Sequence, residues 1–274
     1  MMLNLEAEFT QISLSNDSKK ALLLFYRVRE LLESGELRVA ERRDGNWQVN
    51  SWVKQVILWG FKYGEISEYP SRPFSFYDKD SYPAQNLGLK RDIRLVPGGS
   101  SVRSGAYVAD GTVIMPPSYI NVGAYIDCGC MIDSHALVGS CAQIGKGVHI
   151  SAASQIGGVL EPVNAMPVII EDNVFIGGNC GVYEGTIIKD RAVIGTGVIL
   201  NSSTPIFDST TGEFIRKSES HPLTVPQGAV VVAGSRPISK GYGRELSIHL
   251  YCPVIIKYRD NKTESAIELE DLLR

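Results

Sequence analysis

Several side chains between residues 102 and 206 could take part in proton transfer. The candidates are two carboxylates and two imidazoles: Asp133, Glu184, His135 and His149. A carboxylate or an imidazole held beside a reacting amine can act as its general base. Such residues also occupy tight corners of the backbone, where they serve only local geometry. The residue types therefore leave a catalytic and a structural interpretation open for each candidate.

The elements that must position these side chains follow from a strict six-residue period. Val or Ile occurs at ten consecutive steps of six from Val102 to Ile156, and the count resumes at Ile170 and runs to Ile206. Neither an amphipathic helix, with a period of 3.6, nor a simple strand, with a period of 2, produces this spacing. A hexapeptide repeat does, and it predicts a parallel β-helix in which each hexad is a short strand followed by a corner.

Three hexads form one coil of a triangular prism, so residues three hexads apart should stack about 4.8 Å from one another. We place this β-helix domain over residues 102–235. The spacing from Ile156 to Ile170 is 14 residues, which we count as two hexads plus two residues. It predicts an external loop over residues 157–169, and a second excursion is expected over residues 207–224.

Smaller elements are predicted before the prism. Residues 1–65 are expected to form a helical domain in which Asn16-Asp17-Ser18 and Ser51 cap the starts of helices and Asp44-Gly45 marks a hairpin. Residues 66–101 are rich in Pro, Tyr, Ser and Asp and are expected to be an extended surface linker.

The C-terminal segment, residues 236–274, predicts two strands, Leu246–Tyr251 and Val254–Tyr258, and then a helix capped by Thr263. Because an open β-helix end exposes unpaired backbone groups, the terminal segments should cover those ends. The expected fold class is therefore mainly β: a parallel β-helix of hexapeptide repeats with a small helical N-terminal domain and a short C-terminal strand and helix segment.

Composition places the chain among soluble globular proteins. It is 44% hydrophobic with a net charge of −3, which gives no reason to expect nucleic acid or a membrane as a partner. The N-terminus lacks a basic-then-apolar signal pattern, so the cytoplasm is the expected compartment. His135 and His149 occupy different hexad slots and do not stack, and Cys128 and Cys130 are best interpreted as small buried residues. No metal site is expected.

Several segments are similar to those of a known family. The matching segments are Leu37–Glu41, Met115-Pro116, Tyr119–Tyr125, Val138–Lys146, Ile156–Pro162, Ile169–Asn173 and Leu250–Lys257. On these segments the sequence resembles the tetrahydrodipicolinate N-succinyltransferases of the bacterial lysine and diaminopimelate pathway. The likeness covers nearly the whole chain, and its Gly-Gly-Val-Leu-Glu-Pro segment is far more specific than the hexapeptide repeat, which many acyltransferases share.

The resemblance implies a left-handed β-helix and a homotrimer of parallel prisms, with each active site in the groove between two neighbouring prisms. It also implies succinyl-CoA as a co-substrate, no permanently bound cofactor, and transfer to the amine of 2-amino-6-oxopimelate, the opened form of tetrahydrodipicolinate. Direct N-acylation needs a base for the amine, an aligned thioester carbonyl and donors for the developing oxyanion.

The resemblance also assigns roles to individual residues. Asp133 matches the family's catalytic Asp and is the expected general base. Arg94 matches an Arg that contacts the substrate, and a guanidinium suits a dicarboxylate. His149 matches a His of the family and is expected to be structural or groove-lining rather than catalytic. The thiol arm of CoA should meet the loop at Gly157 and Gly158.

The sequence departs from the family pattern in two places. Where the family often has Glu-Val-Val-Glu-Gly, this chain has Gly-Val-Tyr-Glu-Gly, so the first Glu is Gly181 and the second remains as Glu184. The family's Trp after the catalytic Asp is His135. We expect Glu184 to point into the space beside Gly181 as a second catalytic carboxylate, and His135 to contact substrate. Lys257 and Arg259 are candidates for the CoA phosphates by charge and position alone.

Three alternatives remain open. An N-acetyltransferase acting on the same or another amino acid, or on an amino sugar, would share the fold. A metal-dependent lyase resembling γ-type carbonic anhydrase would need several His on facing surfaces of the prism. A non-catalytic trimeric β-helix scaffold is conceivable because of Gly181.

Overall fold

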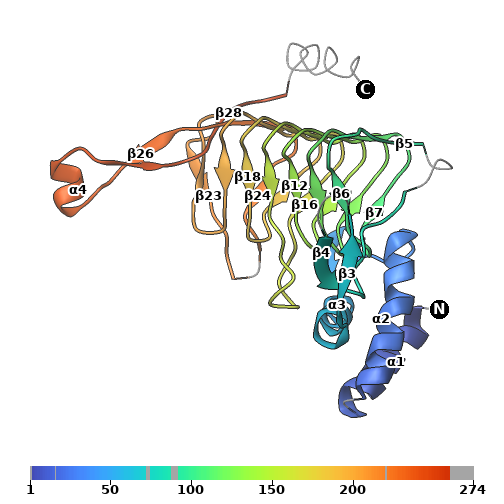
Figure 1. The fold of residues 1–274 in the computed structure, drawn as a ribbon. Helices are drawn as coiled ribbons and strands as arrows, with labels where there is room; N and C mark the ends of the chain where they lie inside the picture. Colours follow the sequence, from blue (N-terminus) through green and yellow to red (C-terminus); the bar gives the residue numbers. More distant parts are fainter. Residues whose placement is uncertain (1, 16, 72–74, 88–91, 220, 260–274) are drawn as a thin grey trace.

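The computed structural model describes residues 2–15, 17–71, 75–87, 92–219 and 221–259. A three-sided parallel β-helix forms its centre, with helices gathered beside one end and a C-terminal arm projecting at the other (Figure 1). The mainly β fold class predicted from the repeat is confirmed. Among the described residues, no helix has both the length and the apolar character to cross a membrane.

Each face of the prism is a parallel sheet. The first face consists of β7 (Tyr107–Val108), β10 (Tyr125–Ile126), β13 (Gln143–Ile144), β16 (Ile169–Ile170), β19 (Ile187–Ile188) and β24 (Thr224–Val225). The second face includes β5 (Ile93–Leu95), β8 (Thr112–Ile114), β11 (Met131–Ile132), β14 (His149–Ile150), β17 (Phe175–Ile176), β20 (Val193–Ile194) and β25 (Ala229–Val232). The third face consists of β6 (Ser101–Val102), β9 (Tyr119–Ile120), β12 (Leu137–Val138), β15 (Gln155–Ile156), β18 (Gly181–Val182) and β21 (Ile199–Leu200).

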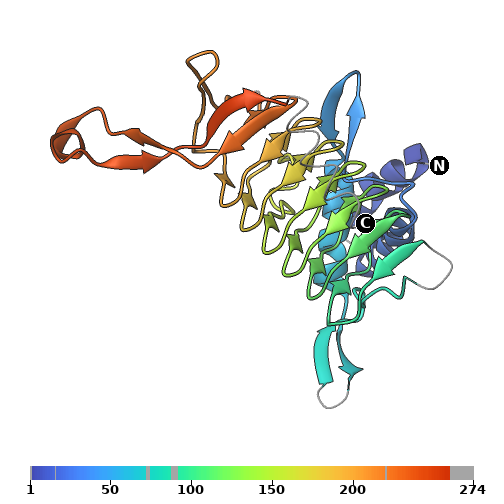
Figure 2. The same cartoon turned by 90° about the horizontal axis from the view of Figure 1, so that it is seen from above.

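The predicted stacking of residues three hexads apart is confirmed by the strand register. Ile126 pairs with Ile144 on the first face, and Ile132 pairs with Ile150 on the second. These four side chains are fully buried in one continuous core. Since neighbouring residues of a strand point to opposite faces, the residue before each anchor lies on the outside of the prism. The coils lie one behind another in a regular stack (Figure 2).

The two interruptions differ from the sequence prediction. Ile156 on the third face is followed directly by Ile170 on the first, so the intervening loop replaces a single corner and not two hexads. The second excursion begins after Leu200 instead of at residue 207. Ile206 therefore keeps the six-residue spacing without being a repeat anchor. It starts β22 (Ile206–Asp208), which pairs with β23 (Glu213–Ile215) and β28 (Val254–Tyr258).

The C-terminal strands extend the second face and form the arm. The strand predicted at Val254–Tyr258 is confirmed as β28, which pairs antiparallel to β25. The arm contains β26 (Ser235–Pro237), the short helix α4 (Gly241–Glu245) and β27 (His249–Tyr251), so the other strand starts later than predicted. The helix predicted after Thr263 lies outside the described residues.

The N-terminal domain has one more helix than the sequence pattern predicted. Helix α1 (Met2–Ser15) precedes α2 (Ser18–Glu33), whose N-cap Asp17 lies within the predicted cap Asn16-Asp17-Ser18. The hairpin of β1 (Ala40–Arg43) and β2 (Asn46–Val49) is confirmed. Helix α3 (Ser51–Tyr63) has Asn50 and not Ser51 at its N-cap.

The segment predicted as an extended linker contains a further hairpin. Strands β3 (Ile66–Pro70) and β4 (Ser75–Lys79) pair antiparallel, and β5 already belongs to the second face. The helices pack on the prism itself, because Val122 and Cys141 from its corners belong to the same buried cluster as the helical side chains.

Candidate functional site

Asp133 and His149 form a side-chain pair on the outside of the prism. Asp133 follows β11 at the corner between the second and third faces, and His149 is the outward residue of β14 in the next coil. His149 Nε2 lies 3.0 Å from Asp133 Oδ2. The imidazole is buried against the edge of the Phe175 ring, whereas the Asp133 side chain is 30% exposed. A buried imidazole therefore orients a carboxylate that remains open to a ligand.

Arg94 lies in the same outward row of the second face. It pairs with Val113, which pairs with Met131, which pairs with His149. Arg94 is exposed, and the ladder places it about 10 Å from Met131 at two strand spacings. The fold thus brings Arg94 and Asp133 to one face, within reach of a single elongated ligand.

His135 lies at the same corner as Asp133. It is exposed and adopts the left-handed conformation, with φ of 63°, which is uncommon for a residue with a side chain. Its backbone N–H donates to Pro117 O at 2.6 Å. The corner places the backbone of His135 in this unusual conformation, and the imidazole is exposed, two residues after Asp133.

Glu184 lies at a different corner, between the third and first faces. It is exposed, with φ of 53°, and its carboxylate accepts hydrogen bonds from the Ser202 backbone N–H at 3.0 Å and from the Ser202 hydroxyl. These bonds hold the pKa of the Glu184 carboxyl below its ordinary value. We expected this carboxylate to fill the space beside Gly181, but it does not. The aromatic ring of Tyr183 occupies that space.

The loop after β15 borders a cleft of about 920 Å³ on this second edge. Its lining includes Gly157, Gly158, Val159, Pro162, Met166, Tyr183, Glu184, Ser202, Lys217 and His221. The two glycines have a packing reason as well. A Cβ on Gly158 would lie 2.7 Å from Ser140 N, and one on Gly157 would lie 2.8 Å from the Tyr183 ring. The backbone of the loop therefore packs directly against the prism.

The two cations predicted for the CoA phosphates, Lys257 and Arg259, do not line this cleft. Lys257 belongs to β28 and pairs with Val230 at the end of the second face. Arg259 donates to the backbone carbonyls of Asn173 and Arg191, at 3.2 and 3.4 Å, so its guanidinium supports two corners of the prism. The described residues that line the cleft do not include either side chain.

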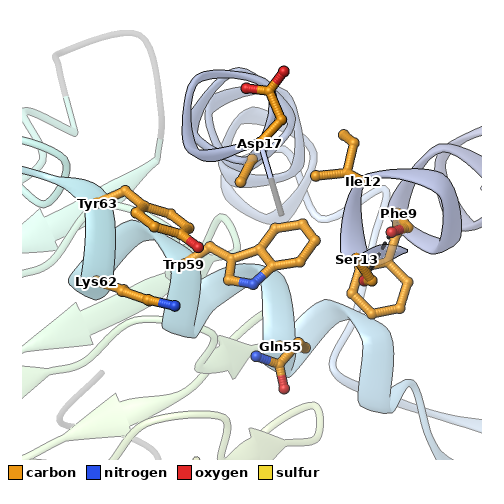
Figure 3. A pocket seen from close by; sticks show the side chains of 9 residues that line it. Phe9, Ile12, Ser13, Asp17, Gln55, Trp59, Lys62 and Tyr63 are labelled. Atoms are coloured by element: carbon orange, nitrogen blue, oxygen red, sulfur yellow. Dashed lines mark hydrogen bonds between the residues drawn. The ribbon is translucent and has the colours of Figure 1, made fainter. Parts of the chain in front are cut away.

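A smaller hollow of about 330 Å³ lies between the three N-terminal helices (Figure 3). The Trp59 ring lies at its centre, with Lys62 and Tyr63 on one side. Its carboxylate, Asp17, already accepts hydrogen bonds from the N–H groups of Lys19 and Lys20 as the cap of α2. This hollow contains none of the predicted site residues.

Metal ligation has no support in the part of the chain that the structure describes. Within it, no cluster of three or more His, Cys, Asp and Glu side chains could hold a metal ion. Cys130 is buried as predicted, whereas Cys128 is exposed.

The fold and the repeat define the class of protein. Residues 167–202 match the family model for the hexapeptide repeat of succinyl-transferase, and residues 4–63 match the N-terminal model of tetrahydrodipicolinate N-succinyltransferase. By its fold and repeat, the protein belongs to the hexapeptide-repeat class.

Sequence relatives give the particular family. A 2,3,4,5-tetrahydropyridine-2,6-dicarboxylate N-succinyltransferase from Paraburkholderia phymatum is 46% identical over 251 residues, which cover 89% of this chain and 86% of the relative. The enzyme of that name from Burkholderia multivorans is 45% identical with the same coverage. The chain belongs to the tetrahydrodipicolinate N-succinyltransferase family. A solved structure described as a tetrahydropyridine-2-carboxylate N-succinyltransferase from Campylobacter jejuni is 19% identical, with a TM-score of 0.46 over 89% of this chain and 63% of that chain.

Sequence reasoning missed the residue that holds the cleft loop. Lys54, in the apolar run of α3, is fully buried, and its ammonium donates to Ala165 O in the loop at 2.6 Å. Burial lowers the pKa of Lys54 and raises that of the neighbouring Cys141 thiol to about 12. The N-terminal domain thereby fixes one wall of the cleft.

Replacing Lys54 with Met should loosen this loop. We expect faster amide hydrogen exchange over residues 157–167, because Ala165 O loses its buried donor while the apolar packing of the stem is kept. Lys62→Met, at an exposed position of the same helix, is the matched control. Equal exchange in the wild type and in Lys54→Met would show that the ammonium does not hold the loop.

The same substitution should change the pH dependence of stability. Because the folded-state pKa of Lys54 is lowered from 10.5, the unfolded chain binds the proton more tightly than the folded chain. This group therefore makes the protein more stable as pH rises toward 10.5, and that contribution should be missing from urea unfolding of Lys54→Met.

Proposed function

We propose that this chain transfers the succinyl group of succinyl-CoA to the amine of tetrahydrodipicolinate in its opened form, 2-amino-6-oxopimelate, in lysine and diaminopimelate biosynthesis. The names of relatives about 45% identical over most of the chain support the reaction. The observation that carries the chemistry is the partly exposed Asp133 carboxylate, which lies 3.0 Å from the buried His149 imidazole. The cytoplasm is the compartment in which such a biosynthetic reaction would run.

In this mechanism Asp133 is the general base. The amine nitrogen attacks the thioester carbonyl carbon, and Asp133 takes the proton that the nitrogen loses. The tetrahedral intermediate then collapses, so that a C–N bond has formed, the C–S bond breaks and CoA leaves as its thiol once protonated. His149 donates to Asp133 Oδ2 and leaves the second oxygen of the carboxylate for the amine. No covalent enzyme intermediate and no permanently bound cofactor are needed.

The complete site is proposed to form between copies of the chain. In one chain the third face separates Asp133 at one edge from the loop cleft at the other. In a closed homotrimer of parallel prisms, the Asp133 edge of one copy can face the loop edge of the next. The acyl donor would then enter along Gly157 and Gly158, and Arg94 would bind a carboxylate of the acceptor. His135 would contact the acceptor beside Asp133.

The first test is the effect of Asp133→Asn on turnover. This nearly isosteric change removes the proton acceptor, so we expect kcat to fall by about 10²–10⁴ while CoA binding is kept. CoA release measured with succinyl-CoA and with acetyl-CoA also identifies the donor. Near-normal turnover would move the base role to His149 or His135, and no turnover by the wild type with either donor would favour a scaffold.

The second test concerns Arg94. Arg94→Ala should weaken binding of the amine substrate by about 1.5–3 kcal/mol, the scale of a hydrogen bond to a charged group. The affinity for CoA, measured by calorimetry, should change little. Equal losses for both ligands would make Arg94 a structural residue.

The third test concerns assembly. Light scattering should give about three times the chain mass of 30.0 kDa. An active, stable monomer would overturn the shared groove, because a single chain would then hold the whole site.

A further inference from the structure

The ring of Tyr183 packs against two glycines at the edge of the third face. A Cβ on Gly181 would collide with the Tyr183 ring and lie 2.9 Å from its hydroxyl oxygen. A Cβ on Gly157, in the neighbouring coil, would lie 2.8 Å from the same ring. Both glycines have negative φ, so their backbone conformation does not require glycine, and the Tyr183 ring is the nearest group that a Cβ at either position would meet. The absence of side chains at these two positions creates the place for Tyr183.

The Tyr183 hydroxyl meets Gln155 in the outward row of the third face. It donates to Gln155 Oε1 at 3.1 Å. Gln155 is exposed, and Tyr183 also lines the cleft beneath the loop. Gln155 pairs with Gly181 in the strand ladder, so the missing side chain at Gly181 lets the ring reach back by one coil.

The pair offers one hydrogen-bond donor and one acceptor side by side. With the hydroxyl donating to Gln155 Oε1, the Gln155 N–H group and a lone pair of the Tyr183 oxygen remain for a ligand. Turning the amide over leaves the Tyr183 O–H and Gln155 Oε1 instead, so the complementarity is the same. A matching ligand presents an N–H beside a carbonyl or carboxylate oxygen, whereas two carboxylate oxygens alone would match poorly.

We propose that Tyr183 and Gln155 are positioning residues that recognise an N–H and oxygen pair of a substrate at the edge of the cleft, where Tyr183 lines it and Gln155 lies beside Tyr183. The inference rests on the proposed acyl transfer for its ligands. Two substrate parts have this chemistry: an amide of the CoA arm, and the amino-acid end of the acceptor. In this chain the phenol of Tyr183 occupies the place beside Gly181, so this part of the site would bind its ligand by hydrogen bonds and not through a charged side chain.

The test separates the two sources by their Michaelis constants. Tyr183→Phe keeps the ring and removes the hydroxyl, so KM for one substrate should rise about threefold to tenfold, the effect of one neutral hydrogen bond, with kcat kept within about twofold. Gln155→Glu replaces the N–H donor with a carboxylate and should raise the same KM at least as much. A rise for succinyl-CoA alone assigns the CoA arm, and a rise for tetrahydrodipicolinate alone assigns the acceptor.

Gly181→Ala tests directly whether the Tyr183 ring needs a residue without a side chain at position 181. The added methyl group must displace the ring, so this variant should show the same KM change as Tyr183→Phe. Tyr242→Phe, on the exposed helix α4, is the control and should behave as the wild type. Unchanged KM values in Tyr183→Phe and Gln155→Glu would overturn the proposal. So would equal rises for both substrates together with a lower melting temperature, since these indicate packing.

Binding measurements keep this result separate from the proposed function. If the wild type turned over no succinyl-CoA, the proposed reaction would fail, but calorimetric Kd values for CoA and for tetrahydrodipicolinate would still be measurable. A weaker Kd for either ligand in Tyr183→Phe would then support the recognition pair. No difference from the wild type for both ligands would reject it.

Discussion

The inward stacking of one aliphatic side chain per hexad determines where every other side chain of the prism points. Ile132 and Ile150 are fully buried and paired in adjacent coils. His149, one residue before its anchor, must therefore face outward, and Asp133, one residue after its anchor, must begin the corner. Their contact at 3.0 Å is a consequence of this register. A slip of one residue would turn His149 into the core of the prism and separate the pair.

Close backbone approach is the second constraint, and it governs the cleft edge. A Cβ on Gly139 would collide with the backbone of Gly158, so the loop can lie on the prism only because both positions lack side chains. The loop is then held from the other side by the buried Lys54 ammonium. Removing a lysine from water is costly unless a partner compensates, so its position on one loop carbonyl ties the helical domain to the cleft.

The sequence predicted what is periodic or local. The three-sided β-helix, a helix cap within Asn16-Asp17-Ser18 and the hairpin at Asp44-Gly45 follow from spacing and turn chemistry. The interruptions were harder to predict, because the six-residue count does not show how many hexads a loop replaces. Ile170 proved to be the next anchor after Ile156, and Ile206 kept the spacing by chance.

The repeat could not predict the directions of individual side chains at the corners. Glu184 was expected beside Gly181, but the ring of Tyr183 fills that space and the carboxylate turns to Ser202. The choice depends on the absence of a Cβ at Gly157, a residue distant in sequence, which no local pattern reveals. Compared with a carboxylate in that space, the phenol of Tyr183 also changes the electrostatics. A dicarboxylate substrate is repelled by a second carboxylate but not by a neutral hydroxyl. In the proposed reaction the charge beside the amine then comes from Asp133, and the third face contributes hydrogen bonds.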